Sequence, residues 1–493
     1  MIKSNNTTSA FLLLLLCFFS KELFAFDPLF TESNLPLKHY DFYNDKEQIF
    51  DKSCNAIDFS KEKITILYAI NLALCNNPNT KISWLNTKKQ AAIYGITKSS
   101  YLPTISGSYS KGNEASWSNS DSSVSNQKVT NKSVTLDWLL YDFGKRSANK
   151  ERDYFALVQS AQQHNRNLQN IIYQVVSAYS NLFAANETLR AAKLSEESNK
   201  LAYDVILKKF QIGTAPRVDV YRIEANYAQA TLLRQQAENS VANYLGAFLQ
   251  VLNLPQGTQV TLEEPYLIRN ASFLTKEIKS LVEEALKNRP DLQALIAQDK
   301  SLRADNLASN LNRLPKISLY GSKDYSYNKN DTAQQSDSIG VKLSFDFFTG
   351  FNKTYAIKET DYSHQSIKEQ KRALENQIAY DVWSAGNNLI TAKETEITAQ
   401  KLLKSALETK KATLEMYKVG RSSSVDVVTA ESSYANALKS LVSAKYGKFT
   451  SEASLLLALG SLNQALIAEQ PLHNTQNENT EIVNEARLEA KAK

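Results

Sequence analysis

Two segments of the chain alternate between apolar and polar residues. In VTLDWLL, from Val134 to Leu140, every second residue from Val134 is apolar. In SIGVKLSFDF the apolar positions are Ile339, Val341, Leu343, Phe345 and Phe347. A period of two predicts β-strands, and this pattern is typical of a strand with one face toward lipid. An antiparallel sheet with one solvated face gives the same pattern, so both interpretations stand at this point.

A partner strand precedes each of these segments. From Thr104, Ile105 and Tyr109 alternate with Ser residues, and from Lys316, Ile317 and Leu319 do the same. The polar loops SKGNEASWSNSDSSVSNQK and YNKNDTAQQSDS separate the strands, a composition typical of solvent-exposed connections. The pattern therefore predicts two β-hairpins, over residues 103–142 and 315–348.

The longest segments have a helical pattern. Residues 145–211 contain neither Gly nor Pro, and residues 351–419 contain one Gly, Gly386. At 1.5 Å per residue the first segment would reach about 100 Å. Ala and Leu recur at spacings of three and four, as in Ala178, Leu182 and Ala185, and provide a seam for lateral packing. Two return helices are expected over 218–252 and 425–459. A further helix opens each half, from Ile64 to Ser100 and from Ile278 to Leu314, each ending before a Pro.

The two halves of the chain repeat one another. FQIGTAPRVDVYRIEANYAQA (210–230) and YKVGRSSSVDVVTAESSYANA (417–437) lie 207 residues apart and share eight identical positions. NNPNTKI (76–82) and NRPDLQA (288–294) correspond at a spacing of 212. This period is far too long for a solenoid repeat. We interpret the chain as a tandem duplication, with a first repeat over 61–252, an equatorial linker over 253–276 and a second repeat over 277–460.

The two ends of the chain differ from the repeats. AFLLLLLCFFS, after a weakly basic start, is too short to span a membrane and predicts a signal peptide over 1–25, followed by an extended segment over 26–60. Leu16 before Cys17 is unlike the small residue of a lipidation site. Cys54 and Cys75 are the remaining cysteines, and in an exported chain we expect them to form a disulfide rather than stay as buried thiols. The tail over 461–493 is polar and expected to be disordered.

Composition excludes several classes of protein. The net charge of +6 is spread along 493 residues without a run of five like charges, so it does not by itself indicate nucleic acid as a partner. The four His residues are isolated, and no GxSxG or HExxH spacing occurs. The DFG at 142–144 lacks the other kinase motifs and fits the end of a strand better. We therefore expect neither an enzyme nor a cofactor or metal site.

Four strands cannot form a closed barrel by themselves. About eight strands make the smallest practical barrel, and an open edge in lipid leaves unsatisfied backbone groups that cost several kcal/mol each. If the strands lie in a membrane, the chain must therefore oligomerise. Two copies would give a filled barrel of eight strands, and three would give twelve strands around an aqueous lumen.

The order of these motifs resembles a known family. The openings ALCNNP and ALKNRP, the two hairpins that begin at Leu-Pro, the strand exit LLYDFGKR and the repeated VDV turns are similar to the TolC family of outer-membrane efflux proteins. The resemblance covers roughly residues 54–462. It implies a mainly α-helical homotrimer with a twelve-stranded transmembrane β-barrel and a periplasmic α-helical tunnel. It also implies a periplasmic adaptor protein and an inner-membrane pump of the RND or ABC type as partners.

The resemblance also implies roles for residues at the helix reversals. The family's aperture aspartate matches Asp426, while its second aspartate matches Thr429. Its gating link matches Tyr417 and Asp219, and its gating arginine lies one position from Arg421, at Ser422. An Asp in the first turn of a helix also stabilises the helix dipole, so Asp219 and Asp426 have a purely structural alternative.

The small residues at the reversals are candidate contacts to the adaptor: Gly213, Thr214, Ala215, Gly420, Ser422 and Ser423. Their alternative role is to permit a tight reversal. For the whole chain we therefore expect an outer-membrane exit duct of a tripartite efflux pump or type I secretion system. The alternative is a secreted or periplasmic coiled-coil scaffold whose hairpins are ordinary soluble sheets.

Overall fold

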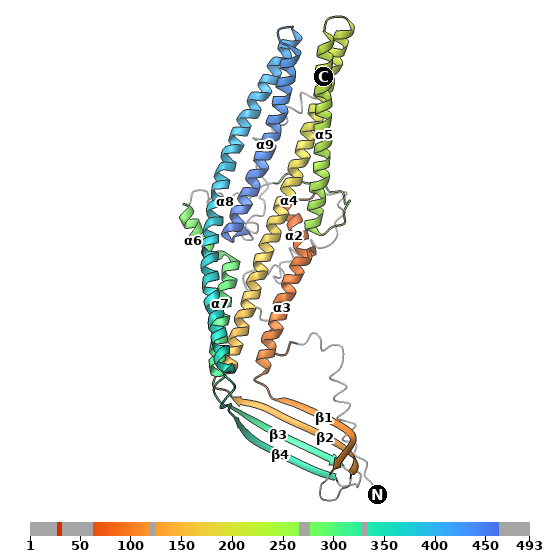
Figure 1. The fold of residues 1–493 in the computed structure, drawn as a ribbon. Coiled ribbons are helices and arrows are strands. Elements are labelled where there is room, and N and C mark those ends of the chain that lie inside the picture. Colours follow the sequence, from red (N-terminus) through yellow and green to blue (C-terminus); the bar gives the residue numbers. More distant parts are fainter. Residues whose placement is uncertain (1–26, 32–62, 118–123, 266–276, 328–332, 463–493) are drawn as a thin grey trace.

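Long helices form the body of the molecule, and a four-stranded sheet lies at one end (Figure 1). The computed structural model describes residues 27–31, 63–117, 124–265, 277–327 and 333–462. The expected fold class, mainly helical with four strands per chain, is confirmed. Within the described residues no helix is long and apolar enough to cross a membrane.

Two helical hairpins make up most of the body. Helices α4 (Lys145–Gln211) and α5 (Arg217–Leu252) form the first, and α8 (Asn352–Lys418) and α9 (Ser424–Leu459) form the second. The first and last residues of α8 and α9 follow those of α4 and α5 by 207 residues in each case. The positive-φ positions next to the ends of these helices correspond at the same spacing: Phe143, Gly144, Gly213 and Asn253 match Gly350, Phe351, Gly420 and Gly460. The duplication in the sequence is therefore a duplication of backbone conformation.

The helix that opens each repeat is broken in two, so the expectation of one continuous helix was wrong. The first repeat has α2 (Ile66–Asn76) and α3 (Pro78–Ser99), and the second has α6 (Ile278–Asn288) and α7 (Pro290–Leu311). Pro78 and Pro290 each lie at the first position of the second helix. The residues before them, Asn77 and Arg289, are extended, with ψ of 123° and 122°. Proline disfavours a helical conformation in the residue before it, which explains both breaks.

The sheet is a simple antiparallel meander. Strands β1 (Thr104–Trp117), β2 (Val124–Tyr141), β3 (Lys316–Tyr327) and β4 (Ala333–Ser344) lie side by side in sequence order. A bulge interrupts the β2–β3 register between Leu139 and Tyr141. The last strand is shorter than its alternating pattern suggested, because it ends at Ser344 and not at Phe347. Phe345 and Phe347 instead lie in the segment that turns into α8.

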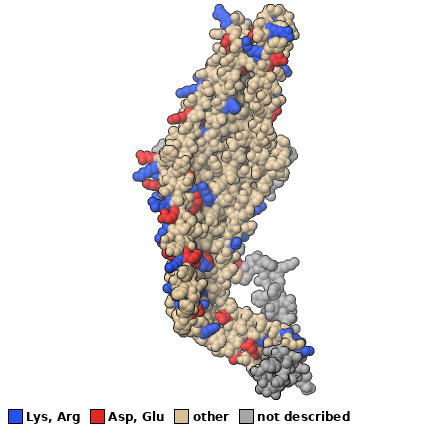
Figure 2. All heavy atoms as spheres, viewed as in Figure 1, with Lys and Arg blue, Asp and Glu red and all other residues tan. Residues whose placement is uncertain are grey.

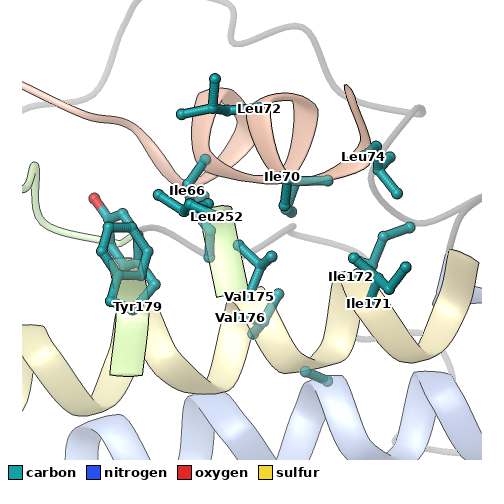
Figure 3. Close-up of a cluster of buried hydrophobic side chains, with 14 of the residues drawn as sticks. Ile66, Ile70, Leu72, Leu74, Ile171, Ile172, Val175, Val176, Tyr179 and Leu252 are labelled. Carbon is teal, nitrogen blue, oxygen red and sulfur yellow. The ribbon is translucent and has the colours of Figure 1, made fainter. Parts of the chain in front are cut away.

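The largest apolar core lies near the middle of the helical body. Side chains of α2, α4, α5 and α9 meet there, among them Ile70, Ile172, Val175 and Leu252 (Figure 3). The buried Tyr179 ring packs at its edge, and the Tyr179 hydroxyl lies 2.7 Å from the carbonyl oxygen of Ile64 and 2.5 Å from that of Glu263. This hydroxyl ties the start of the first repeat to the linker after α5. A second core, of α6, α7, α8 and α9, contains Ile378 and Val382.

Several sequence-based expectations lie outside the described residues. They are the signal peptide, most of the 26–60 segment, the second half of the 253–276 linker and the tail from residue 463. Cys75, at the end of α2, is disulfide-bonded. Cys54 lies outside the described residues, so its pairing with Cys75 stays a prediction.

Candidate functional site

The predicted aperture residues lie at the ends of the two helical hairpins, opposite the sheet (Figure 1). Figure 2 shows basic and acidic side chains mixed at these ends and along the edge formed by α6, α7 and α8. The face over α4 and α5 carries few charges in this view. The hairpin ends are therefore polar and accessible, as a docking or aperture surface requires.

The first reversal joins α4 to α5 without a side-chain cap. Gly213 has φ of +77°, and the Thr214 N–H donates to the Lys209 carbonyl over 2.8 Å, which closes the end of α4. Pro216 occupies the N-cap of α5 and offers no side-chain acceptor. Asp219 is consequently available for another partner, and its Oδ1 pairs with Arg222 Nη1 at 3.1 Å.

The second reversal has the same backbone and different side-chain chemistry. Gly420 has φ of +75°, and the Arg421 N–H donates to the Met416 carbonyl over 2.8 Å. Ser423 and Asp426 form a capping box at the start of α9. Asp426 Oδ2 accepts hydrogen bonds from the Ser423 hydroxyl, the Ser423 N–H and the Ser422 hydroxyl, at 2.7, 2.9 and 3.0 Å. These bonds lower the pKa of Asp426 below its usual value, so the carboxylate is ionised while it caps the helix.

Tyr417 joins the two hairpins near this end. Its ring packs against the buried cluster of Ile206, Val220 and Ile223 in the first hairpin. The Lys209 Nζ lies 4.3 Å from the ring centroid, a cation–π contact. The structure thus places Tyr417 against the turn of α5 that carries Asp219. Within the described residues, however, no hydrogen bond joins Tyr417 to Asp219, and Asp219 pairs with Arg222 instead.

Two further predicted residues have local roles in the structure. The Thr429 hydroxyl donates to the Val425 carbonyl one turn earlier in α9, over 2.8 Å. Arg421 contributes its backbone N–H to the end of α8. The capping box therefore supports the structural alternative for Asp426, and the gating roles of all five residues remain proposals.

Glu431 is a connecting residue to which the sequence assigned no role. Its carboxylate pairs with Lys410 of α8 at 3.0 Å and accepts a hydrogen bond from Ser198 of α4 at 3.2 Å. It therefore links both hairpins. The sequence did show that Glu431 matches Glu224 in the repeat. This identity did not predict a role for Glu431, because a Glu on a helix face usually contacts water.

The two faces of the sheet differ in chemistry. One cross-strand row consists of Ser106, Thr135, Ser322 and Ser338. Hydroxyl–hydroxyl contacts of 2.6 Å (Ser106–Thr135) and 2.9 Å (Ser322–Ser338) run along it. The next row, on the opposite face, consists of Ile105, Leu136, Gly321 and Ile339. Trp138, Leu319 and Val341 form another row on that opposite face.

The apolar face of the sheet has no cover within the described residues. Ile105, Val134, Ile339, Val341 and Leu343 are all exposed. A soluble sheet would bury this face against helices, but here the helices lie beyond the end of the strands (Figure 1). A sheet whose apolar face contacts lipid and whose hydroxyl-rich face contacts water explains both the exposed apolar side chains and the row of hydroxyl groups.

Comparisons with known proteins agree with this arrangement. A family model described as outer membrane efflux protein matches residues 69–252 and 281–461, well over half of the chain. Protein CyaE of Bordetella pertussis is 24% identical over 301 residues, which cover 60% of this chain and 63% of CyaE. Alkaline protease secretion protein AprF of Pseudomonas aeruginosa is 22% identical over 419 residues, which cover 81% of this chain and 85% of AprF.

A solved structure has the same fold. The CmeC outer membrane channel of Campylobacter jejuni superimposes with a TM-score of 0.70 at 20% sequence identity, covering 88% of this chain and 94% of CmeC. The two segments of the family match coincide with the two structural repeats. The chain therefore belongs to the outer membrane efflux protein family, which confirms the outer-membrane channel expected from the sequence over the periplasmic scaffold.

Proposed function

We propose that three copies of this chain assemble into one exit duct across the outer membrane. Each copy contributes four strands to a twelve-stranded barrel and two helical hairpins to a tunnel on the periplasmic side. The hydroxyl-rich face of the sheet lines the water-filled lumen, and the apolar face contacts lipid. The duct is passive, and a partner supplies the energy for transport.

The unpaired edges of the sheet carry this proposal. Within the described residues, β1 pairs with β2 alone and β4 pairs with β3 alone, so each has a free edge. Free edges are not tolerated in lipid. In a four-stranded meander β1 and β4 are antiparallel, so β4 of one copy can pair with β1 of the next without a change of pattern. Three copies leave no free edge and enclose a lumen.

The hairpin ends are the proposed docking surface for a periplasmic adaptor, which in turn binds an inner-membrane RND or ABC pump. Gly213, Thr214, Ala215, Gly420, Ser422 and Ser423 lie at these ends and offer small side chains to a partner. The name of AprF refers to secretion of a protease, and CmeC is described as a channel. The proposal leaves the cargo open among drugs, metals and secreted proteins.

We also propose that the hairpin ends form the aperture of the duct. Tyr417 and Asp219 would link the hairpins in the closed state, with Arg421 and Thr429 beside them and Asp426 as an acidic ring. The packing of Tyr417 against the helical turn next to Asp219 supports this pairing. In this structure the Asp219 carboxylate is paired with Arg222. Closure of the aperture would therefore require Asp219 to exchange Arg222 for Tyr417 as its partner.

Cell fractionation followed by mass measurement tests the proposal. We expect the full chain in the outer-membrane fraction, and after detergent extraction a particle with the protein mass of three chains. The edge-to-edge pairing of strands predicts that this particle resists mild denaturants and dissociates on heating. A protein that is soluble without detergent, or a monomer in detergent, would contradict the proposal.

A further inference from the structure

The apolar face of the sheet changes its chemistry toward the end that lies away from the helices (Figure 1). Nearer the helices, Ile105, Leu136 and Ile339 share one cross-strand row on this face. The alternation of the strands places four lysines farther out on the same face: Lys111, Lys128, Lys132 and Lys323. It places three tyrosines among them: Tyr109, Tyr325 and Tyr327. The face therefore passes from apolar to basic and aromatic along the strands.

The lysines leave this outer part of the face positively charged. Lys323 Nζ lies 3.3 Å from Asp337 Oδ2 on the neighbouring strand. In the part of the chain that the structure describes, no acidic side chain pairs with Lys111, Lys128 or Lys132. Asp324 belongs to the other, hydroxyl-rich face, where it accepts a hydrogen bond from the Ser322 hydroxyl over 2.9 Å. Asp337 therefore offsets only one of these positive charges.

Two of the lysines lie over tyrosine rings. Lys132 Nζ is 6.0 Å from the Tyr327 ring centroid, and Lys323 Nζ is 5.7 Å from the Tyr325 centroid. Lys132 is also paired across the strands with Tyr109 on one side and Tyr325 on the other. These cation–π contacts hold the ammonium groups near the sheet and still leave their remaining sides open to an anion.

A hollow of about 340 Å³ lies among these side chains. Its lining includes Gly107, Tyr109, Lys132, Val134, Lys323 and Tyr325. A Cβ built on Gly107 would lie 3.9 Å from its nearest neighbour, the Ser133 carbonyl oxygen, so the space above this glycine is open. The absence of a side chain at Gly107 therefore leaves room between the lysines and the tyrosines for part of a ligand.

The level of the hollow in the membrane follows from the orientation of the duct. The helices lie on the periplasmic side, so the far end of the strands faces the outer surface. Tyrosine is enriched where hydrocarbon meets headgroups, and the long lysine side chain places its charge in the polar layer. The hollow then lies where the apolar interior of the membrane ends and the headgroups of the outer leaflet begin.

We propose that the hollow binds the phosphorylated headgroup of an outer-leaflet lipid, with Lys132 and Lys323 pairing with its phosphate. Lysine binds phosphate as a point charge. The next row toward the helices contains Ile105 and Ile339, which are 74% and 78% exposed, so hydrocarbon chains joined to the headgroup have an apolar surface to cover. Cations beside an uncovered apolar row fit a ligand that is anionic at one end and apolar at the other. The inference rests on the proposed function, because the barrel turns this face toward lipid.

Lipid retention by the purified protein tests the site. Full-length protein in detergent, stripped of bound lipid, would be mixed with lipid A, a phosphorylated glycolipid, and the lipid bound per trimer measured by native mass spectrometry. Lys132→Gln/Lys323→Gln should weaken binding roughly tenfold or more. Lys132→Arg/Lys323→Arg should retain it. Lys316→Gln/Lys342→Gln is the matched control, because these exposed lysines lie on the hydroxyl-rich face, and it should bind lipid A like the parent.

Two single substitutions separate a shaped site from a general attraction of charges. Gly107→Leu keeps every charge and fills the hollow, so it should weaken binding. Gly321→Leu, on the same face but not in the lining of the hollow, is its control. Asp337→Asn removes the partner of Lys323 and should strengthen binding. Unchanged binding in both Gly107→Leu and Asp337→Asn would overturn the site.

The outcomes distinguish this site from the duct itself. Binding that needs the phosphates of lipid A and both lysines supports the site. A conducting trimer that binds dephosphorylated lipid A equally well, or that binds none, would overturn the site and leave the duct standing. Displacement of lipid A by inorganic phosphate at equal concentration would indicate a free-phosphate site and contradict the lipid. A protein that is soluble without detergent would overturn both proposals.

Discussion

At the scale of single residues, His164 is a buried titratable group within the helical body. It lies on α4 facing α3, where its Nδ1 is 2.7 Å from the Ser83 hydroxyl and its ring is 5.6 Å from the Trp84 ring. Burial lowers the pKa of His164 to about 4 from an ordinary value of 6.5. The side chain is therefore neutral in the folded protein at neutral pH, and it accommodates a proton poorly.

This burial predicts a loss of stability in weak acid. Because the folded-state pKa is depressed, the unfolded chain binds the proton more tightly. The stabilisation is fully present above pH 6.5 and declines as the pH falls from 6.5 toward 4. At 1.36 kcal/mol per pKa unit the loss is about 3 kcal/mol per chain. Thermal unfolding followed from pH 7.5 to 4.5 should show a smaller decrease for His164→Gln than for the parent. Equal decreases would contradict this account of His164.

The proposed gate makes a second prediction at this scale. If Tyr417 and Asp219 join the hairpins in the closed state, then Tyr417→Phe combined with Asp219→Ala should raise single-channel conductance. Glu224→Gln is the control for loss of an acidic side chain, because Glu224 is an exposed residue of α5 to which no gating role is assigned. An unchanged single-channel current in the double variant would show that Tyr417 and Asp219 do not hold the aperture closed.

At the scale of elements, the two helices of the second hairpin end with a similar backbone conformation in different surroundings. Gly460 follows α9 with φ of +72°, and a Cβ there would lie 2.8 Å from the Arg289 Cα. Gly420 follows α8 with φ of +75°, and a Cβ there would meet no described atom within 4 Å. The two glycines thus separate the cost of a left-handed backbone from the cost of a steric clash.

This difference predicts unequal effects of the same substitution. Gly420→Ala should cost roughly 1 kcal/mol, the usual penalty of a left-handed backbone in an L-residue. Gly460→Ala should cost more, on the order of 3 kcal/mol, because the methyl group also displaces the break between α6 and α7. Comparing the thermal midpoints of the two variants measures the difference. If Gly460→Ala proved as stable as Gly420→Ala, the backbone around Arg289 would be able to move away from the added methyl group at little cost in free energy.

The elements also show what sequence could and could not predict. The bounds of α4 and α5 follow from residues 145–211, which lack Gly and Pro, and from a turn that the repeat displays twice. The breaks at Pro78 and Pro290 were missed, since the apolar periodicity continues across them. The capping box of Asp426 was readable from the Ser423 spacing. The ion pair of Asp219 with Arg222 was not, because it depends on Pro216 leaving Asp219 without a capping partner.

At the scale of the whole molecule, the duplication makes one chain present the same architecture twice with unequal surfaces. On α7 the residues Ala294, Ala297 and Ala308 are buried, whereas Ile82, Leu85 and Ile96, 212 positions earlier on α3, are exposed. Among the residues that the structure describes, the sheet likewise has two free edges and one uncovered apolar face. These exposed apolar side chains and free strand edges fit the trimeric duct that we propose.

The most direct test of this central claim is electrical. Purified full-length protein, extracted from the outer membrane in detergent, would be added to a planar lipid bilayer between salt solutions under an applied voltage. A trimeric barrel with a water-filled lumen predicts discrete current steps of uniform size, absent with detergent alone. Trimeric protein that inserts into the bilayer and carries no ionic current would contradict the account.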